Sequence, residues 1–409
     1  MADRPLTGIR VLDLTRVLAG PLTAQMLGDL GAEVTKVERP GSGDDSRIYG
    51  APYLHDAEGR QTRENAFYLS ANRNKKSVTI NIATPEGQEL IRRLAAEADI
   101  LLENYKVGDL KRYGLDHDSL KALNPRLIYC SITGYGQDGP YAKRPGYDAI
   151  FQGMGGLMSV TGLPDGVEGG GPMKIGPSIA DVLASLNALS AVLGALYHRD
   201  AQGGTGQHID IALLDSVVAA MSHYAQIHLI SGEIPVRRGT QGNGGMPAAM
   251  FPTSDRPIML TAGNETQYVR LCRAVERPDL IEDARFRTNA DRVRNRAALT
   301  EVFNAIFTTR SRAEWLDRLD KAGVPSGPVN DLGEVFQDDH VRHRGLRVDV
   351  DHPLGQQLGL IRSPLRYSHT PLDHYAPPPM FGQHTDEVLE SVLGIDADQR
   401  ERLRASGII

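Results

Sequence analysis

The fold is decided by Gly8-Ile-Arg-Val-Leu-Asp-Leu-Thr-Arg-Val-Leu-Ala-Gly-Pro21 and the residues that follow it as far as Glu38. Ile9–Leu14 is mostly apolar and predicts a buried strand, 21–30 predicts a helix, and 32–38 predicts a second strand. A strand, a helix and a strand in succession predict two parallel strands with a right-handed crossover. The first turn holds Gly20 alone instead of the three glycines of a dinucleotide fingerprint, which disfavours an NAD(P) site.

The same alternation recurs along the chain. Further strands are predicted at 77–82, 100–103, 126–132 and 207–211, and helices at 84–98, 116–123, 178–198 and 213–230. Strands that alternate with helices predict an α/β domain with a mostly parallel sheet.

A smaller α+β domain is predicted after the glycine- and proline-rich stretch 239–257. It contains a strand at 258–261 and helices near 266–275, 295–308 and 312–322, and Val324–Pro328 is interpreted as a return linker. The predicted division is therefore 1–225 for the first part of the large domain, 226–330 for the small domain, and 331–409 for the return to the large domain.

Composition excludes several classes of function. A net charge of −6 and the lack of a basic tract argue against a nucleic-acid or anionic-membrane partner. The two distant cysteines favour reduced thiols, and the N-terminus lacks a signal-peptide pattern, so we expect a cytoplasmic protein. The apolar stretch 175–197 contains Pro177 and Asp181, which favours a buried helix over a membrane span. No P-loop, H-E-x-x-H, paired C-x-x-C or G-x-S-x-G motif occurs, so we expect no metal site.

Asp181 is the most informative single residue, because it is the only charged residue between Ile179 and Leu196. Burying a lone carboxylate is costly and needs a reason. Spacing alone favours a structural reason, in which Ser178 is the N-cap and Asp181 completes a capping box. The functional reading makes Asp181 a nucleophile that stays ionised at neutral pH and attacks a carbonyl with water excluded.

Other candidate groups are less specific. Cations are scattered at predicted strand ends and adjoining loops, where a polyphosphate could bind, although each could equally be a solvated surface residue: Arg16, Arg39, Arg47, Arg73, Lys75, Lys76, Lys106, Lys111 and Arg112. The loop 239–245 is glycine-rich and could close over a site or be an ordinary connection. His223, His228, His340 and His343 lack metal-ligand spacing and favour structural or solvated roles.

Many short blocks in one order resemble the class III CoA-transferases, the family of formyl-CoA and carnitine CoA-transferases. Beyond the opening stretch these blocks are 27–34, 36–44, 72–77, 84–87, 103–105, 134–140, 146–148, 179–181, 323–325 and 382–388. The resemblance covers essentially the whole chain. It implies a Rossmann-like large domain, a smaller domain and an interlocked homodimer, with acyl-CoA and a carboxylic acid as substrates and no tightly bound cofactor.

The resemblance also implies roles for individual residues. Asp181 matches the catalytic nucleophile, which forms an aspartyl anhydride and then an aspartyl–CoA thioester. The implied CoA contacts are Leu18, Ala19, Arg39, Ile80, Ala83, Asn104, Tyr105, Lys106, Arg112, Pro145, Gly146, Tyr147 and Asp148. The implied closing loop carries Gly242, Gly244 and Gly245, although this match is looser.

The substrate is less determined than the family. Leu18 and Tyr49 stand where the formyl-CoA and oxalate branch has Gln and Trp, and several stretches look closer to the succinyl-CoA:dicarboxylate branch. The candidates to bind the second carboxylate of a dicarboxylic acid are Arg47, Arg73, Arg237 and Arg238. Two alternatives stay open: an acyl-CoA racemase or epimerase that uses an Asp/His pair with His223 or His228, and a non-catalytic CoA-binding protein.

Overall fold

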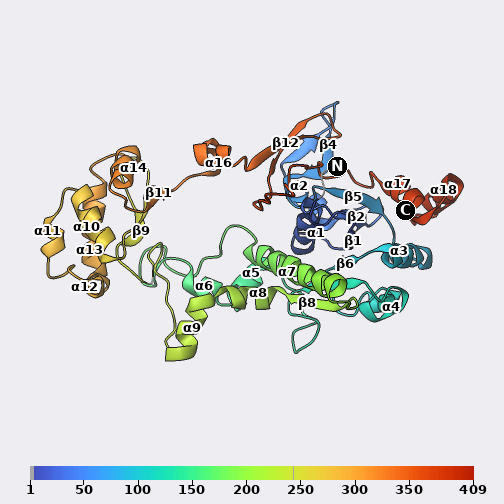
Figure 1. The fold of residues 1–409 in the computed structure, drawn as a ribbon, viewed down its shortest axis with the longest axis horizontal. Coiled ribbons are helices and arrows are strands. Elements are labelled where there is room, and N and C mark those ends of the chain that lie inside the picture. Colours follow the sequence, from blue (N-terminus) through green and yellow to red (C-terminus); the bar gives the residue numbers. More distant parts are fainter. Residues whose placement is uncertain (1–3, 243) are drawn as a thin grey trace. The chain divides into compact units, whose positions relative to one another are not determined.

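The computed structural model describes residues 4–242 and 244–409 and divides them into two units (Figure 1). Unit 1 comprises residues up to 157 together with 174–233 and 344–409, and unit 2 comprises 158–173 and 234–343. The sequence had placed 158–173 in the large domain and ended the small domain at 330. The structure assigns 158–173 and 331–343 to unit 2, and it assigns 226–233, predicted as part of the small domain, to unit 1.

Unit 1 is built on a six-stranded parallel sheet. In chain order its strands are β1 (Arg10–Asp13), β2 (Glu33–Glu38), β5 (Lys75–Thr79), β6 (Ile100–Glu103), β7 (Ile128–Thr133) and β8 (His208–Ala212). They lie in the order β5-β2-β1-β6-β7-β8, so the chain winds outward from β1 in one direction and then from β6 in the other. This order is that of the doubly wound dinucleotide-binding folds, in which ligands bind where the winding reverses. The predicted parallel sheet is confirmed, and the reversal lies between β1 and β6.

Helices cover both faces of this sheet, because successive side chains of a strand point to opposite faces. On β1, Val11 packs into one core cluster and Leu12 into the other. The Val11 face is covered by α1 (Ala19–Asp29), α5 (Asp148–Met154), α7 (Ile179–Ala201) and α8 (Leu213–Ala220). The Leu12 face is covered by α3 (Pro85–Glu97), α4 (His117–Leu123), α17 (Thr385–Leu393) and α18 (Ala397–Ala405). These two layers bury the strands that carry the site.

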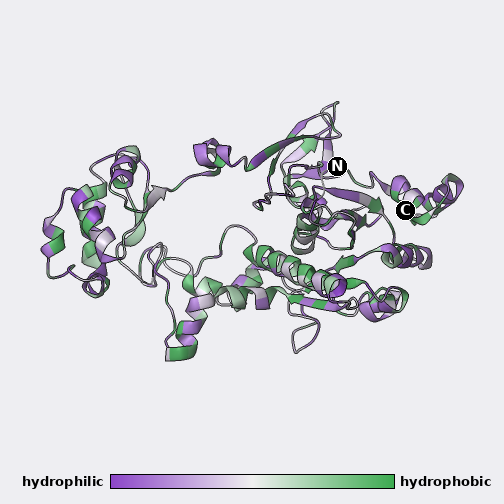
Figure 2. Cartoon of the chain, in the orientation of Figure 1, coloured by the Kyte–Doolittle hydropathy of each residue, from purple (hydrophilic) through white to green (hydrophobic). Residues whose placement is uncertain are grey.

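Helix α7 is the long apolar helix that the sequence predicted. By length and composition it is the one helix of the described chain that could cross a membrane. It packs on α1, α5, α8 and β7, and nine of its residues are buried, among them Ala184 and Val192. Its apolar character is visible in Figure 2. Core packing therefore accounts for part of that character.

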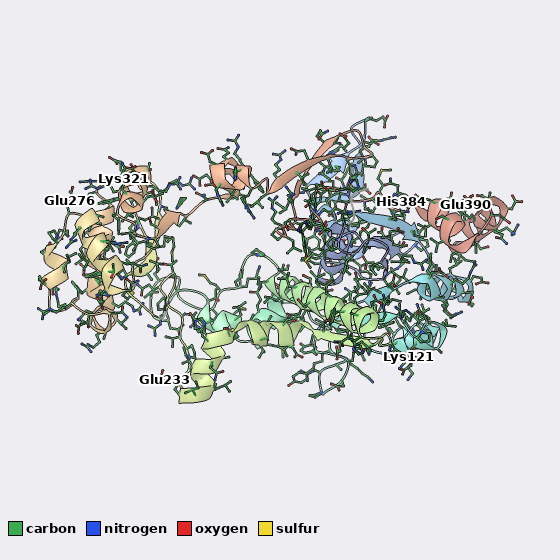
Figure 3. The ribbon with its side chains drawn as sticks, in the orientation of Figure 1. Lys121, Glu233, Glu276, Lys321, His384 and Glu390 are labelled. Atoms are coloured by element: carbon green, nitrogen blue, oxygen red, sulfur yellow. The ribbon has the colours of Figure 1, made fainter. Side chains whose placement is uncertain are left out.

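Smaller elements complete unit 1. They are the 3-10 turns Asp45–Ile48 and Lys111–Tyr113, the hairpin β3 (Tyr53–His55) and β4 (Gln61–Asn65), α2 (Ala66–Ser70), α6 (Leu157–Val160, which crosses into unit 2), α9 (Ser222–Ser231), β12 (Arg347–Asp351) and β13 (Gln357–Ile361). The C-terminal segment, which carries His384 (Figure 3), returns to β5. There the backbone N–H of His384 donates to the carbonyl of Ser77 at 2.9 Å.

Unit 2 has its own core around Phe303, Phe307 and Trp315. Its antiparallel sheet runs in the order β11 (Ser326–Pro328), β10 (Ile258–Thr261), β9 (Ala248–Phe251). Its helices are α10 (Glu265–Ala274), α11 (Asp279–Glu282), α12 (Asn289–Arg294), α13 (Arg296–Phe307), α14 (Arg312–Lys321), α15 (Leu332–Gln337) and α16 (Asp339–His343). The predicted α+β character agrees with these elements.

Two local predictions were wrong. The segment 213–230 was predicted as one helix, but α8 and α9 are separated at Met221, and the next residue, Ser222, has φ of +46°. The stretch 324–328 was interpreted as a linker, but its last three residues pair with β10. Apolar periodicity does not register a single left-handed residue, and a short edge strand rich in Pro and Gly lacks strand composition.

Candidate active site

The turn after β1 lies where the winding of the sheet reverses. Its backbone packs tightly: a Cβ on Gly20 would lie 2.3 Å from the Thr15 side chain, so only glycine fits there. Val17 has φ of +71°, a left-handed conformation that is costly for a β-branched residue. The turn leads into α1, whose N-cap, Leu18, makes no side-chain capping bond among the residues described. The N–H groups at the start of α1 therefore remain available to another acceptor.

Asp181 lies in the first turn of α7, which packs against α1. The proposed capping box is wrong, because within the described chain the Ser178 side chain makes no capping bond. The N-terminal amide of α7 is satisfied from elsewhere: Ala180 N–H donates to Asp148 Oδ1 at 2.8 Å. Asp181 therefore does not form the capping box with Ser178 that its spacing suggested.

The carboxylate of Asp181 is half-buried and has no cation beside it among the residues described. Burial raises its pKa to about 6, and the neighbouring Asp148 adds to the rise. The backbone N–H of Ala19 and its own N–H act in the opposite direction by donating to the carboxylate. Asp181 therefore sits at the positive ends of two helices, α1 and α7, and is mostly ionised at pH 7. A partly desolvated, unpaired carboxylate of this kind is a competent nucleophile.

A pocket of about 330 Å³ opens beside this turn, at the carboxyl ends of β1, β2 and β6. Five of the expected CoA contacts line it: Arg39, Ile80, Ala83, Tyr105 and Arg112. The structure brings these residues together from four separate stretches of the chain. Arg16 also lines the pocket and lies over the Tyr105 ring at 4.9 Å. Cations and an aromatic ring at this position suit the phosphates and base of a nucleotide.

Three other expected CoA contacts have different surroundings. Both groups of the Asn104 amide bond the backbone of Arg16, with Arg16 N–H donating to Oδ1 at 2.9 Å and Nδ2 donating to the Arg16 carbonyl at 2.7 Å. Lys106 lines a neighbouring cavity of about 220 Å³. Asp148, besides capping α7, accepts a bond from Gln152 at 2.7 Å. Two of these side chains therefore bond backbone groups, Asn104 at Arg16 and Asp148 at Ala180.

The remaining expected contacts lie on the turn or on the loop before α5. Leu18 and Ala19 begin α1, Pro145 and Tyr147 are exposed, and Gly146 packs on Phe151 so closely that a Cβ there would lie 2.2 Å from the ring. Only glycine can occupy position 146 in this packing.

Arg47 and Arg73 are unsuited to bind a substrate carboxylate in this structure. Arg47 is buried and bonds Glu38 at 2.7 Å and Glu64 at 2.9 Å, while its guanidinium lies 3.6 Å from the Tyr68 ring centroid. Arg73 is buried against Asp29, which accepts from Nε at 2.8 Å. Arg73 precedes β5 and Lys75 begins it. Both residues therefore lie at the amino end of this strand, whereas ligands of such sheets bind at the carboxyl ends. The sequence could not show which cations already had internal partners.

The glycine-rich loop belongs to unit 2. Gly245 approaches Gly263 so closely that a Cβ would lie 2.4 Å from its Cα, whereas Gly244 has open space around the position of a Cβ. Asn243 lies outside the described residues. Arg237, a candidate for the substrate carboxylate that lies in the same unit, pairs with Asp165. The loop's role as a lid stays a prediction.

The Asp/His pair of the racemase reading is not assembled around Asp181. His223 and His228 are exposed on α9, and His228 Nδ1 lies 3.1 Å from the Glu233 carbonyl. Neither is among the groups that shift the pKa of Asp181. His340 and His343 lie on α16 of unit 2. Across 4–242 and 244–409, no group of three His, Cys, Asp or Glu side chains could hold a metal ion.

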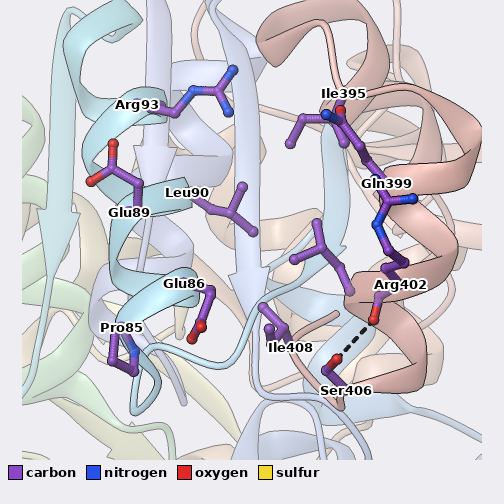
Figure 4. Close-up of a pocket in the computed structure, with 11 residues that line it drawn as sticks. Pro85, Glu86, Glu89, Leu90, Arg93, Ile395, Gln399, Arg402, Ser406 and Ile408 are labelled. Carbon is purple, nitrogen blue, oxygen red and sulfur yellow. Dashed lines mark hydrogen bonds between the residues drawn. The ribbon is translucent and has the colours of Figure 1, made fainter.

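A pocket of about 600 Å³ between α3 and α18 contains none of the expected site residues (Figure 4). It is an open groove lined by Leu90, Ile395 and Leu403 with charged side chains around them. Cavity size alone would therefore point away from Asp181.

Comparison with known proteins identifies the family of the chain. Residues 6–385 match the sequence model of CoA-transferase family III. The chain is 42% identical to the succinate–glutarate CoA-transferase of Agrobacterium fabrum, with 96% of each chain covered. It is 41% identical to the succinyl-CoA:glutarate CoA-transferase of Mus musculus, over 99% of this chain and 90% of that one. The crystal structure of a CAIB/BAIF family protein from Brucella suis superposes with a TM-score of 0.86 at 42% identity, covering 95% of this chain and all of that one.

Proposed function

Because the chain belongs to CoA-transferase family III and is a CoA-transferase, we propose that it moves CoA from succinyl-CoA to glutarate or a close dicarboxylic acid. Two relatives at 41–42% identity carry names that pair succinate with glutarate. Further relatives, at 36% and 35% identity, are named for D-citramalate and L-malate. The shared element of these names is a dicarboxylate, which supports a dicarboxylate as the acceptor here.

Asp181 is proposed as the nucleophile. Its Oδ attacks the thioester carbonyl of succinyl-CoA, the C–S bond breaks, and a succinyl–aspartyl anhydride and CoA thiolate form. The thiolate attacks the aspartyl carbonyl, releases succinate and leaves an aspartyl–CoA thioester. The acceptor carboxylate then displaces the thiolate to give a second anhydride, and the thiolate attacks the acceptor's acyl carbonyl. The new acyl-CoA leaves, and Asp181 is a free carboxylate again.

The observation that carries this proposal is the unpaired carboxylate of Asp181 at two helix N-termini. When thiolate attacks the aspartyl carbonyl, negative charge develops on an Asp181 oxygen. The Ala19 N–H, which already donates toward that carboxylate, is a suitable donor for this oxyanion, and the dipole of α1 acts in the same sense. The adjoining pocket would hold the nucleotide of CoA through Arg39 and Arg112.

An interlocked homodimer in the cytoplasm is proposed as the working form. Helices α7, α8 and α9 leave large apolar side chains exposed, among them Leu186, Tyr197, Leu229 and Ile230. Such exposure on neighbouring helices supports burial against a second copy. Both cysteines, Cys130 and Cys272, are unpaired and buried, which suits a reducing compartment. One chain has a mass of 44.5 kDa, and light scattering should give twice that mass.

The test mixes the protein and succinyl-CoA with free glutarate, hydroxymethylglutarate, itaconate, malate, oxalate or formate, and follows acyl-CoA species by mass spectrometry. Glutaryl-CoA or another dicarboxylyl-CoA should form, and Asp181→Ala should form none. Activity should fall below about pH 6 as the carboxylate is protonated, because its pKa is about 6. Product formation by Asp181→Ala would refute the nucleophile. Transfer to none of these acids would refute the dicarboxylate reading.

The racemase alternative is not favoured by the comparisons. It predicts deuterium at the α-carbon of a branched acyl-CoA after incubation in D₂O, with no acceptor acid present. The transferase proposal predicts no such exchange.

A further inference from the structure

We infer that Asn104 and Asp44 are positioning residues, which hold the strained turn after β1 so that the Ala19 N–H is presented to Asp181. The inference rests on the proposed nucleophilic role of Asp181. It adds that the geometry of the donor depends on side chains that never touch the reacting atoms.

The strain at Val17 shows that the turn is held. A β-branched residue with φ of +71° is strained and persists only where surrounding contacts over-determine the backbone. Val17 comes two residues before Ala19. A relaxed turn would therefore redirect the first N–H of α1.

Asn104 is the first clamp. It follows β6, and its amide bonds both the N–H and the carbonyl of Arg16. Two bonds from one planar group fix the orientation of the Arg16 backbone as well as its position. The neighbouring strand β6 thereby sets the angle at which the chain leaves β1.

Asp44 is the second clamp. Its Oδ1 accepts from Val17 N–H at 3.0 Å and from Ser46 N–H at 2.8 Å. Its Oδ2 pairs with the fully buried Lys36 at 2.8 Å, and Lys36 also donates to the Thr15 carbonyl at 2.8 Å. This ion pair therefore bonds the backbone of the turn on both sides of Arg16, at the residue before it and at the strained residue after it. Together the two clamps engage three consecutive residues.

The test compares Asn104→Ala with Asn124→Ala in the full chain. Asn124 is a matched control, since its half-buried amide also bonds only backbone groups, donating to the carbonyls of Ala95 and Ala98 and accepting from Arg126 N–H. Asn104→Ala should lower kcat about 10- to 100-fold, as small misplacements of reacting groups do. The KM for succinyl-CoA should change less than threefold. Asn124→Ala should lose similar thermal stability and keep its kcat.

A second readout follows the ionisation of Asp181. Loss of the Ala19 donor should move the acid limb of kcat against pH upward in Asn104→Ala, because that N–H holds down a pKa that burial and Asp148 raise. Asp44→Asn, which keeps an oxygen for Val17 N–H, should show a smaller shift in the same direction. A purely structural role would leave the limb unmoved.

The outcomes separate the two proposals. A wild-type kcat and acid limb in Asn104→Ala, or a raised KM with unchanged kcat, would overturn the positioning role and make Asn104 a CoA contact. Turnover by Asp181→Ala would overturn the nucleophile itself. An inactive Asp181→Ala beside an unaffected Asn104→Ala leaves the proposed function standing and removes only this inference.

Discussion

Two buried carboxylates near the carboxyl end of the sheet, Asp13 and Asp44, differ from the carboxylate of Asp181 at the start of α7. All three are at least partly removed from water, but their partners differ. Asp13 bonds Lys75 at 2.9 Å and Asp44 pairs with Lys36, and all four side chains are fully buried. Burial would raise the pKa of Asp44, but Lys36 and backbone N–H donors lower it to about 2. Asp181 has no such cation within the described chain, and its pKa rises to about 6.

The presence or absence of a cation distinguishes carboxylates that hold the backbone from a carboxylate that is available to react. A buried carboxylate that is matched by a buried ammonium is satisfied and fixes the backbone around it. A half-buried carboxylate that is held only by N–H groups retains a lone pair that can attack an electrophile. Three predictions test this contrast, from the largest expected effect to the smallest.

Asp181→Asn should lower CoA transfer by at least about 1,000-fold, as loss of a covalent nucleophile does. The same change should not destabilise the fold. Because the folded-state pKa lies above the ordinary 3.8, ionisation makes stability fall as pH rises through about 6, and the amide removes that cost. Thermal unfolding at pH 8 and pH 4 checks this, with a gain of roughly 1–2 kcal/mol expected at pH 8 only. A large loss of stability in this variant would show that Asp181 has a structural role, as Asp13 and Asp44 do.

Lys36→Met should destabilise the protein by about 3–5 kcal/mol, because it leaves Asp44 buried without its cation. Lys76→Met is the matched control. Lys76 pairs with Glu387 at 2.8 Å, but both side chains are about half exposed, so its loss should cost under about 1 kcal/mol. Urea unfolding of the two variants measures the difference, and equal costs would contradict the framework role.

Glu103→Gln tests a third carboxylate, which is buried at the end of β6 and has no cation beside it among the residues described. Burial raises its pKa to about 7, while Ser131 and the Tyr105 N–H oppose the rise. The folded state therefore binds more protons than the unfolded state between pH 4.5 and 7, and stability falls as pH rises across that window. The variant should gain roughly 1–3 kcal/mol at pH 8 and nothing near pH 4. A uniform effect at both values would show that Glu103 is not titrating in the fold.

The parallel sheet was predictable because its strands are short apolar runs separated by helices with good start and stop signals. Thr84 does cap α3 by accepting from Gly87 N–H at 3.1 Å, as its sequence indicated. The break between α8 and α9 and the strand β11 were missed, because each depends on one or two backbone conformations that composition does not record.

The candidate site was predicted in part. Five expected CoA contacts meet in one pocket, but Arg47 and Arg73 turned out to be internal partners of Glu38, Glu64 and Asp29. A cation looks the same in the sequence whether it faces a ligand or a buried acid. The clamps formed by Asn104 and Asp44 carried no signal, because they join residues 88 and 27 positions apart.

The sequence by itself determined the family, the alternation of strands and helices, and the isolation of one acid in an apolar helix, because these are properties of neighbouring residues. The tertiary structure alone decided which buried acids are paired with a cation and which are not. Pairing depends on distances between separate strands and helices, so the fold decides whether a buried acid has an opposite charge within about 3–4 Å of it.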